Sequence, residues 1–376
     1  MIQYLLRSSA KGRQPPASIA RWDSTWQRIG FIKLRLEPPG RIRTWHDVLY
    51  IFYNHDFLRL ALSVIWLIVC GLIESFLAQL SEIRYSHFPY DKVRHSDLMH
   101  DAFPRVENYL TVNYLLLTTL LYTTLGFALQ SPDWTTRIVV LRRWLVIMGA
   151  IYIFRGICVA VTTLPSSRVN NCVPSDIALN GSAGARFSFL FRQIGGQLSP
   201  CTDNIFSGHT SAMMSCVMVW RIHTRVRRIF SWIAYLIVLA ALLMILFTRF
   251  HYTVDVLLAV YITYSAWYMY MDTILEASKR TMFAFRGHST RSLFRSRLAS
   301  FDADTTYEFL TWQPTPLMPT WVMWLCMYAD GLDIRLRALG IMDEHGRLTY
   351  EAEQHMHSPS PPMVDIHEMT SQSLPT

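Results

Sequence analysis

Two polar stretches of this chain contain residue types that support nucleophilic and acid–base chemistry. Residues 201–210 read Cys-Thr-Asp-Asn-Ile-Phe-Ser-Gly-His-Thr, and residues 251–255 read His-Tyr-Thr-Val-Asp. In a helix, the four-residue spacing places His251 and Asp255 on one face. An imidazole backed by a carboxylate can act as a nucleophile or a proton carrier, and His209 supplies a second imidazole. These three residues are therefore the candidate catalytic group.

The candidate group fits the two steps of a phosphoryl-type transfer. His251, held in one tautomer by Asp255, is the candidate nucleophile toward phosphorus, which predicts a phosphohistidine-type intermediate. His209 can protonate the departing alkoxide and then deprotonate the incoming alcohol. The scheme needs no metal and no cofactor, and the carboxylates are too few and too scattered for a two-metal site.

Ser207 and Asp203 are candidate supporting residues. Ser207 and Gly208 suit a tight turn at a helix start, where free backbone N–H groups favour phosphate oxygens. Asp203 precedes His209 by six residues and cannot share its helical face, but it can orient the imidazole from the preceding loop. The alternative is that all these polar residues only pack helix ends, with Ser207 as a cap.

The composition predicts an all-α membrane protein. Of 376 residues, 51% are apolar and only 16% are charged. The apolar residues cluster in six blocks, at about 58–80, 109–130, 144–164, 205–220, 229–248 and 252–271. Most blocks reach the roughly 20 residues that a helix needs to cross a bilayer, and the fourth is the short one. Because no alternation suggests a barrel, we expect six transmembrane helices rather than a soluble bundle.

The basic residues of the short links predict the orientation of these helices. The links after the second and fourth blocks are rich in arginine: Arg137, Arg142, Arg143, Arg221, Arg225, Arg227 and Arg228. The links at 81–107 and 165–204 are charge-balanced and sparsely charged, respectively. Because the arginine-rich links should face the cytosol, we expect both termini to be cytosolic. The histidines of both motifs then lie at the same membrane depth, which predicts a bundle with a lumen-facing active site.

Three regions follow from this organisation. Residues 1–56 are a cytosolic N-terminal segment, 57–280 a six-helix transmembrane catalytic domain, and 281–376 a cytosolic C-terminal region with a disordered tail. The first apolar block is expected to be an uncleaved signal anchor. The net charge of +8 favours an anionic membrane surface over nucleic acid as a partner, and a homo-oligomer is left open.

Two charged residues interrupt the apolar blocks. Glu74 lies in the first block, and we interpret it as reaching the membrane interface rather than as functional. Arg155 is the one charge in the third block and must snorkel, pair or line a cavity. Because it is about 15 Å from the lumenal end of its helix, we expect it to face a cavity and bind an anion.

Two cysteines lie on the side of the membrane that we expect to be oxidising. Cys172 and Cys201 both belong to the long link before the first motif. A disulfide between them would tie the start of that link to the catalytic turn. Two free, buried thiols are the alternative, and the sequence leaves the choice open.

At this point the motifs resemble a known family. The 201–210 and 251–256 stretches are similar to the third and fourth signature motifs of the sphingomyelin synthase family, within the lipid phosphate phosphatase superfamily. Residues 152–165 look like its second motif, and residues 58–280 match its six-helix plan, including both cysteines. The resemblance implies that His209, His251 and Asp255 form a catalytic triad. It also implies transfer of a phospho-headgroup from a glycerophospholipid to the ceramide primary hydroxyl, in the Golgi, plasma membrane or endoplasmic reticulum.

The chain departs from the family pattern at three places. Thr202 stands where the family usually has glycine, and a turn with positive φ would be strained there. Some members carry an acidic residue about thirty positions before the first histidine, where the nearest carboxylate here is Asp176. The first motif is at best weakly represented, by residues 100–104.

Two other functions remain as alternatives. A lipid phosphate phosphatase typically grips its dianionic substrate with a Lys-x6-Arg-Pro element, and none of the four lysines begins one: Lys11, Lys33, Lys92 and Lys279. Arg249 is close to His251 but not at the phosphatase spacing. A monoanionic phosphodiester needs fewer cations, which favours the transferase. The other alternative is a non-enzymatic ceramide- or lipid-binding protein, and the headgroup stays open among choline, ethanolamine and inositol.

Overall fold

The computed structural model of the chain describes residues 25–29, 32–36, 45, 57–87, 93–130, 134–168, 172–194, 201–224, 226, 228–285 and 320–331. Most of the expected N-terminal segment and the expected disordered tail lie outside these residues. The chain divides into two compact units, Pro15–Thr273 and the combination of Met1–Gln14 with Ile274–Thr376. In the second unit the described elements are the last turns of α11 (Thr253–Phe285) and helix α14 (Thr320–Asp330).

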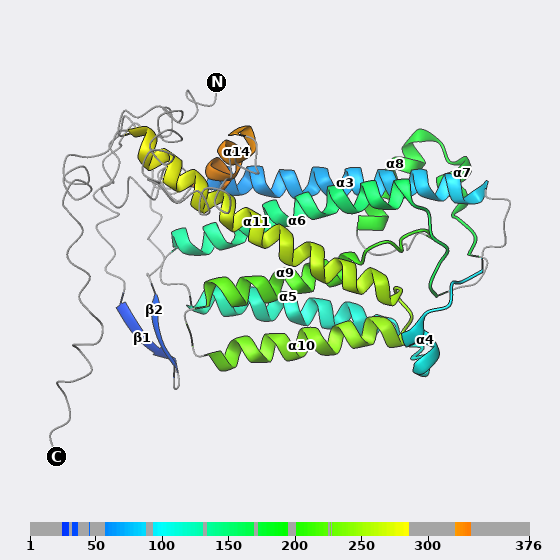
Figure 1. The fold of residues 1–376 in the computed structure, drawn as a ribbon, viewed down its shortest axis with the longest axis horizontal. Coiled ribbons are helices and arrows are strands. Elements are labelled where there is room, and N and C mark those ends of the chain that lie inside the picture. Colours follow the sequence, from blue (N-terminus) through cyan, green and yellow to red (C-terminus); the bar gives the residue numbers. More distant parts are fainter. Residues whose placement is uncertain are drawn as a thin grey trace, which may run out of the picture. The chain divides into compact units, whose positions relative to one another are not determined.

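The unit at Pro15–Thr273 has a long helix at each of the six apolar blocks. These are α3 (Phe57–Ser86), α5 (Leu110–Gln130), α6 (Trp134–Val161), α9 (Gly208–His223), α10 (Arg228–Phe247) and the start of α11. Figure 1 shows α3, α5, α6, α9 and α10 running alongside one another while α11 slants across them. The predicted helical architecture is confirmed. A short antiparallel hairpin, β1 (Thr25–Ile29) with β2 (Ile32–Leu36), precedes the helices and was not anticipated by composition.

The core lies where α9 meets its neighbours. Helix α3 packs along α6, and α9 packs against α5, α6 and α10. A cluster of buried apolar side chains joins α5, α9, α10 and α11: Val112, Met213, Val238, Ala241, Ile245, Leu246 and Val256. The Nε1 of Trp267 in α11 donates to Ser215 Oγ of α9 at 3.1 Å, which adds a polar contact inside this core. Helix α9 is thereby enclosed by other helices.

Four of the helices are long and apolar enough to cross a membrane. They are Phe57–Ser86, Leu110–Gln130, Arg137–Val161 and Arg228–Phe247. Helix α9 has only 16 residues, as the short fourth block predicted, and its buried side includes Thr210, Ser211 and Ser215. A helix enclosed by other helices needs no apolar surface toward lipid, which explains its weaker hydropathy. The outer helices instead expose large apolar side chains such as Ile65, Phe76 and Leu236.

Three short helices lie in the links at one end of the long helices. They are α4 (Leu98–Ala102), α7 (Asp176–Asn180) and α8 (Ala183–Ile194). Asp97 caps α4, and its side chain accepts hydrogen bonds from the backbone of Met99 and His100. Both histidines of the candidate site lie in or next to the helix ends at which these links arrive.

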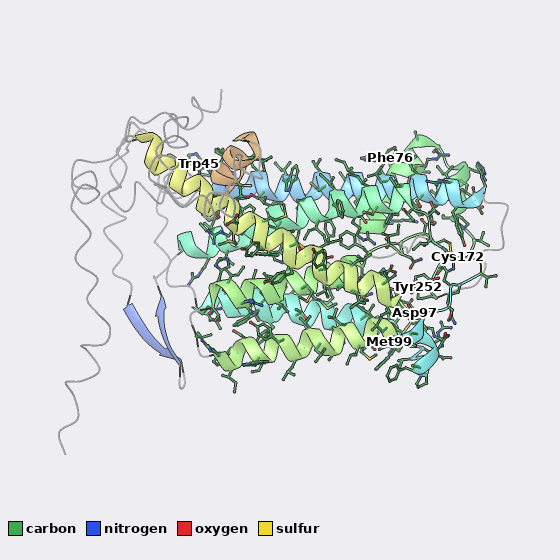
Figure 2. The ribbon with its side chains drawn as sticks, viewed as in Figure 1. Trp45, Phe76, Asp97, Met99, Cys172 and Tyr252 are labelled. Atoms are coloured by element: carbon green, nitrogen blue, oxygen red, sulfur yellow. A yellow bond between two sulfur atoms is a disulfide. The ribbon has the colours of Figure 1, made fainter. Side chains whose placement is uncertain are left out.

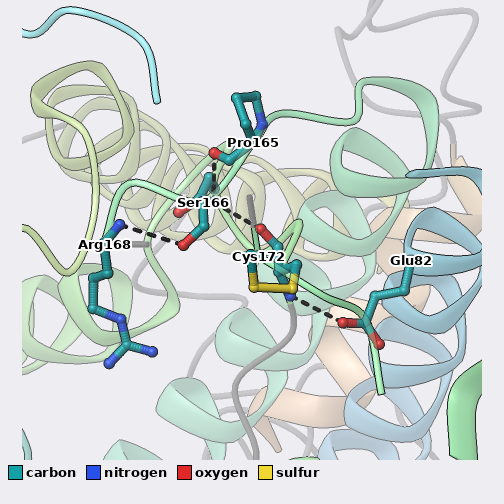
Figure 3. Close-up of a disulfide and its surroundings, with 7 residues drawn as sticks. Glu82, Pro165, Ser166, Arg168 and Cys172 are labelled. Atoms are coloured by element: carbon teal, nitrogen blue, oxygen red, sulfur yellow. Dashed lines mark hydrogen bonds between the residues drawn. A yellow bond between two sulfur atoms is a disulfide. The ribbon is translucent and has the colours of Figure 1, made fainter. Parts of the chain in front are cut away.

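A disulfide fastens the long link between α6 and α9 (Figure 3). Cys172 and Cys201 are bridged, with their Cα atoms 5.7 Å apart, so the structure selects the bridge over two free thiols. The backbone N–H of Cys201 also donates to Glu82 Oε1 at 2.9 Å. The turn before the first motif is therefore tied both to the link and to the end of α3.

Thr202 does not carry the backbone strain that the family comparison predicted. Among the described residues, Arg249 is the one non-glycine residue with positive φ, at 56°. Thr202 is fully buried and its carbonyl accepts from Asn204 N at 2.9 Å. The expectation of a strained turn at Thr202 is wrong, because this turn is held by the disulfide and by Glu82 without a left-handed residue.

The left-handed residue closes α10 instead. Phe250 N donates to Ile245 O and Arg249 N donates to Leu246 O, the two bonds of a Schellman motif. Glycine is the usual residue at this position, and an arginine there costs about 1–2 kcal/mol of backbone strain. The motif turns the chain sharply, so that His251 follows α10 after a gap of only three residues.

Removal of the disulfide should destabilise the long link. The chain-entropy model predicts that loss of a bridge with 29 residues of separation costs about 3 to 4 kcal/mol. We expect the double substitution Cys172→Ser and Cys201→Ser to lower the thermal unfolding midpoint of the purified protein in detergent. Cys158→Ser, which removes a free thiol, is the matched control and should change the midpoint little. Labelling of Cys172 and Cys201 by a thiol reagent in native, unreduced protein would contradict the bridge.

Candidate active site

The structure brings the three predicted catalytic residues together. His209 is the second residue of α9, and Asp255 lies in the first turn of α11, with His251 just before that helix. The centroids of the two imidazole rings are 6.5 Å apart. The two motifs also touch through the backbone, since Ser207 N donates to Asp255 O at 3.3 Å. One small region therefore holds both imidazoles and the carboxylate.

Asp255 lies directly behind His251. Its Oδ2 is 3.7 Å from His251 Nδ1, and the two side chains are 0% and 3% exposed. The same oxygen accepts from the backbone N–H of Tyr252 at 3.0 Å, which fixes the carboxylate. The separation from Nδ1 exceeds a hydrogen bond, as is common in catalytic pairs without substrate. With Nδ1 toward the carboxylate, Nε2 is the nitrogen available for attack.

Asn113 of α5, rather than Asp203, orients His209. The Nε2 of His209 lies 3.1 Å from Asn113 Oδ1, and an amide oxygen only accepts, so Nε2 carries the proton. The Nδ1 of the neutral ring is then the nitrogen that accepts a proton. Asp203 makes its ion pair with Arg155 and acts on His209 only through its charge, so its supporting role stays a prediction. The sequence gave little sign of the role of Asn113, because it is an uncharged amide and is distinguished only as the one asparagine of the second apolar block.

Ser207 caps α9, as the structural alternative proposed. Its Oγ accepts from the N–H of Thr210 at 3.2 Å, and its carbonyl accepts from the N–H of Ser211 at 3.0 Å. The hydroxyl is thus committed to the helix start. This cap holds His209 at a fixed place at the mouth of the bundle.

Arg155 joins three segments around the base of the site. Its Nε donates to Phe206 O at 2.6 Å, and its two terminal nitrogens pair with Glu74 of α3 and with Asp203. The side chains of Arg155, Glu74 and Asp203 are 6%, 13% and 25% exposed. Arg155 therefore pairs with two carboxylates of the chain itself, and its expected binding of a substrate anion stays a prediction. Glu74 does not extend to the membrane interface, because its carboxylate pairs with Arg155.

Asp97 and His100 hold the chain at His251, a role that the sequence did not reveal. Thr253 donates to Asp97 from its backbone at 2.7 Å and from its hydroxyl at 2.6 Å, so Asp97 caps α11 as well as α4. His100 Nε2 donates to His251 O at 3.1 Å, and Arg249 donates to His100 O at 2.9 Å. Figure 2 shows Asp97, Met99 and Tyr252 gathered at this end of the helices.

The electrostatics of Asp97 and His100 agree with these contacts. Burial alone would raise the pKa of Asp97, but hydrogen bonds from Thr253 and His100 outweigh it, and the pKa is lowered. Burial lowers the pKa of His100, and the charge of Asp97 opposes this only in part. His100 is therefore neutral at neutral pH, and its one ring N–H is the donor to the His251 carbonyl.

An aromatic ring and a cation border the two imidazoles. The ring of Phe250 meets His209 edge-on at 4.9 Å and His251 at 5.2 Å between centroids. The guanidinium of Arg168 lies over Phe250 at 4.8 Å and over Tyr109 at 5.2 Å. The sequence offered Arg168 only as one sparse charge of a lumenal link. The neighbouring residue Ser167 positions Arg168 beside the site, because its Oγ donates to the carbonyls of Arg249 and Phe250.

Asp176 takes no part in this arrangement. It lies at the exposed start of α7, so it does not replace the acidic residue that some family members carry before the first histidine. The carboxylate beside Cys201 is Glu82, which comes from α3. In the described part of the chain, no group of three or more His, Cys, Asp or Glu side chains is placed to hold a metal ion.

Comparison with known proteins agrees with this geometry. The family model described as PAP2 superfamily C-terminal matches residues 200–272, which include both motifs. Phosphatidylcholine:ceramide cholinephosphotransferase 2 of Mus musculus is 37% identical over 136 residues, which is 33% of this chain and 36% of that protein. Phosphatidylcholine:ceramide cholinephosphotransferase 1 of Homo sapiens is 32% identical over 161 residues, which is 39% of this chain and 38% of that protein. The resemblance to sphingomyelin synthases is therefore confirmed over a stretch that spans little more than a third of these relatives.

Loss of the Arg155 guanidinium should destabilise the protein strongly. Arg155→Met leaves two carboxylates near each other without their partner, which typically costs about 3 to 5 kcal/mol. We expect a large drop in the free energy of unfolding, measured by denaturant titration in detergent micelles. Adding Glu74→Gln should recover part of the loss, because it removes one of the unpaired charges. Arg168→Met is the control, since its guanidinium makes no ion pair with any described residue and should contribute about 1 kcal/mol or less. Equal effects of the two arginine variants would contradict the network.

Proposed function

We propose that the protein transfers the phospho-headgroup of a glycerophospholipid to the primary hydroxyl of ceramide and releases diacylglycerol. The observation that carries the proposal is the pair of imidazoles 6.5 Å apart, one of them backed by Asp255. This spacing leaves room for one phosphorus centre between a nucleophile and a proton carrier. The names of the mammalian relatives, which describe ceramide cholinephosphotransferases, support the same reaction class.

In the first step His251 Nε2 attacks the phosphorus of the donor lipid. A P–N bond forms and the P–O bond to the diacylglycerol oxygen breaks. His209, protonated at Nδ1 as well as Nε2 in this step, gives the Nδ1 proton to that oxygen, so that diacylglycerol leaves as a neutral alcohol. Asp255 stabilises the positive charge that develops on the imidazole of His251.

In the second step ceramide regenerates the enzyme. The Nδ1 of His209 takes the proton of the ceramide primary hydroxyl, whose oxygen attacks the phosphorus. The P–O bond to ceramide forms while the P–N bond to His251 breaks, and both histidines return to their starting states. The Asn113 contact keeps Nε2 of His209 as a donor throughout, so the same nitrogen gives and takes the transferred proton.

The charge balance of the site supports a phosphodiester substrate over a phosphomonoester. A phosphatase that binds a dianion needs several cations around the phosphate. Arg155, the arginine buried beneath the motif, is already paired with two carboxylates. This leaves few positive charges for the substrate and favours the monoanionic phosphodiester of a phospholipid, with a lipid alcohol as acceptor.

We also propose that all six long helices span the membrane, with both termini in the cytosol and the site facing the lumen or the exterior. The disulfide supports this orientation, because bridges persist in oxidising compartments and this one lies beside the site. The clustered arginines at the opposite helix ends support it through the positive-inside rule. The endoplasmic reticulum, the Golgi and the plasma membrane all satisfy these constraints.

Headgroup transfer should depend on the two histidines. We expect purified protein to convert fluorescent ceramide into a phospho-headgroup product with at least one of phosphatidylcholine, phosphatidylethanolamine and phosphatidylinositol. His251→Ala and His209→Ala should each lower the rate by about a thousandfold or more, because each removes a reacting group. His87→Ala, an exposed histidine after α3, is the control and should retain the rate.

The same assay separates the alternatives. Release of a free headgroup phosphate without a ceramide product would indicate a hydrolase. The absence of any ceramide product from all three donors, with folded protein, would refute the transferase. Retained transfer in His251→Ala would refute the nucleophile assignment.

The proposed orientation predicts which introduced cysteines are accessible from the cytosol. In sealed microsomes, a membrane-impermeant maleimide should label Arg228→Cys at the start of α10. It should label Asn180→Cys at the end of α7 only after the membrane is permeabilised. Both residues are exposed, so burial does not explain a difference between them. Labelling of Asn180→Cys in intact vesicles would overturn the orientation.

A further inference from the structure

Arg168 is a cation beside the two histidines that the proposed chemistry does not use. Its guanidinium is half-buried and stacks over one face of Phe250 at 4.8 Å and of Tyr109 at 5.2 Å. Phe250 in turn contacts both imidazoles, so the guanidinium is one aromatic ring away from each. The charge of Arg168 is felt at His209. A phosphate held between the histidines would therefore lie close to this arginine.

The guanidinium of Arg168 has no acceptor of its own in the part of the chain that the structure describes. Its backbone N–H donates to Ser166 Oγ at 3.3 Å (Figure 3), but no carboxylate or carbonyl accepts from its side chain. Arg155 differs in this respect, because all three of its nitrogens are engaged. Burial lowers the pKa of Arg168, yet a guanidinium stays charged at neutral pH. A half-buried charge with free donors is suited to an anion.

The surroundings of Arg168 add positive charge. Arg105 is exposed nearby and its charge acts on Arg168. The charge of Asp203 also acts on Arg168, but Asp203 is paired with Arg155, and Asp97 accepts hydrogen bonds from Thr253. Arg105 and Arg168 thus place two positive charges near the Phe250 face.

We propose that Arg168 binds a non-bridging oxygen of the donor phosphodiester and selects donor lipids whose headgroup carries no positive charge, such as phosphatidylinositol. This rests on the proposed transferase function and narrows its donor class. A planar guanidinium suits two oxygens of a phosphate, and stacking leaves its N–H edges free to reach them.

The same geometry disfavours a choline headgroup. A quaternary ammonium is recognised by the faces of aromatic rings. Here the guanidinium already covers one face of both Phe250 and Tyr109, and a second cation placed nearby would be repelled. An uncharged, hydroxyl-rich headgroup meets no such repulsion. The chain would then differ in donor from the mammalian relatives, whose names specify phosphatidylcholine.

A binding measurement without turnover tests the proposal. In the His251→Ala background, full-length protein in neutral detergent micelles is titrated with short-chain fluorescent phosphatidylinositol and phosphatidylcholine. We expect the inositol lipid to bind at least tenfold more tightly. Adding Arg168→Gln should weaken its binding by about tenfold and remove the preference. Arg192→Gln, an exposed arginine of α8, is the matched control and should leave both affinities unchanged.

A second variant separates recognition from folding. Arg168→Lys keeps the charge but loses the planar fork, so it should retain more phosphatidylinositol binding than Arg168→Gln. The unfolding midpoint of each variant is measured alongside, and a binding loss at an unchanged midpoint supports a direct contact. Equal binding of both lipids, or an affinity that Arg168→Gln leaves unaltered, would overturn the proposal.

The transfer assay distinguishes a failure of the donor selection by Arg168 from a failure of the proposed transferase function. Rapid transfer from phosphatidylcholine, unaffected by Arg168→Gln, refutes the donor selection and leaves the transferase intact. Binding of phosphatidylinositol that depends on Arg168, without a ceramide product from any donor, refutes the transferase and leaves the anion site standing. Transfer from phosphatidylinositol that falls at least tenfold in kcat/KM in Arg168→Gln supports both.

Discussion

The site depends on one buried ion network, the guanidinium of Arg155 between Glu74 and Asp203. It connects α6 with α3 and with the loop before α9, and the partners of Arg155 are 48 to 81 residues away from it in the chain. Placing these charges beneath a membrane bundle is costly unless each is paired, so the three side chains fix one another. The Phe206 carbonyl, a further acceptor of Arg155, sets where α9 begins. The position of His209 follows from that start.

The other half of the site is fixed from the opposite direction. Asp97 caps both α4 and α11, and His100 donates to the carbonyl of His251, so α4 acts as a clamp on the turn before α11. That turn is made by Arg249 in a left-handed conformation, which stores strain next to His251. The strain is tolerated because the Arg249 side chain ends on the His100 carbonyl. His209 and His251 are thereby held by separate sets of contacts, and their imidazoles lie close together.

The helices and the proximity of His209, His251 and Asp255 were predictable, and the contacts that position them were not. Long apolar runs predict helices because backbone groups in lipid must bond within the chain, and a four-residue spacing aligns His251 with Asp255. Pairings such as Arg155 with Glu74 join different helices and leave no periodic trace in the sequence. The sequence likewise gives no sign of the contact between Asn113 and His209, because only the packing of α5 against α9 brings the two residues together. Of the described helices at the six apolar blocks, four are long and apolar enough to span a membrane, and the enclosed α9 is shorter, with 16 residues.

Arg155 and Arg168 show how one site uses the same side chain in two ways. Arg155 donates to two carboxylates and a carbonyl, which hold its guanidinium in one position between helices. Arg168 is positioned by stacking, the interaction that holds a guanidinium by its face while its N–H edges stay free. Its backbone is fastened by the neighbouring Ser167, whose hydroxyl donates to the turn that carries Phe250. In the proposed scheme the structural charge of Arg155 lies between helices, and the recognition charge of Arg168 lies on a tethered link. A change of residue there would alter the donor lipid without disturbing the imidazoles.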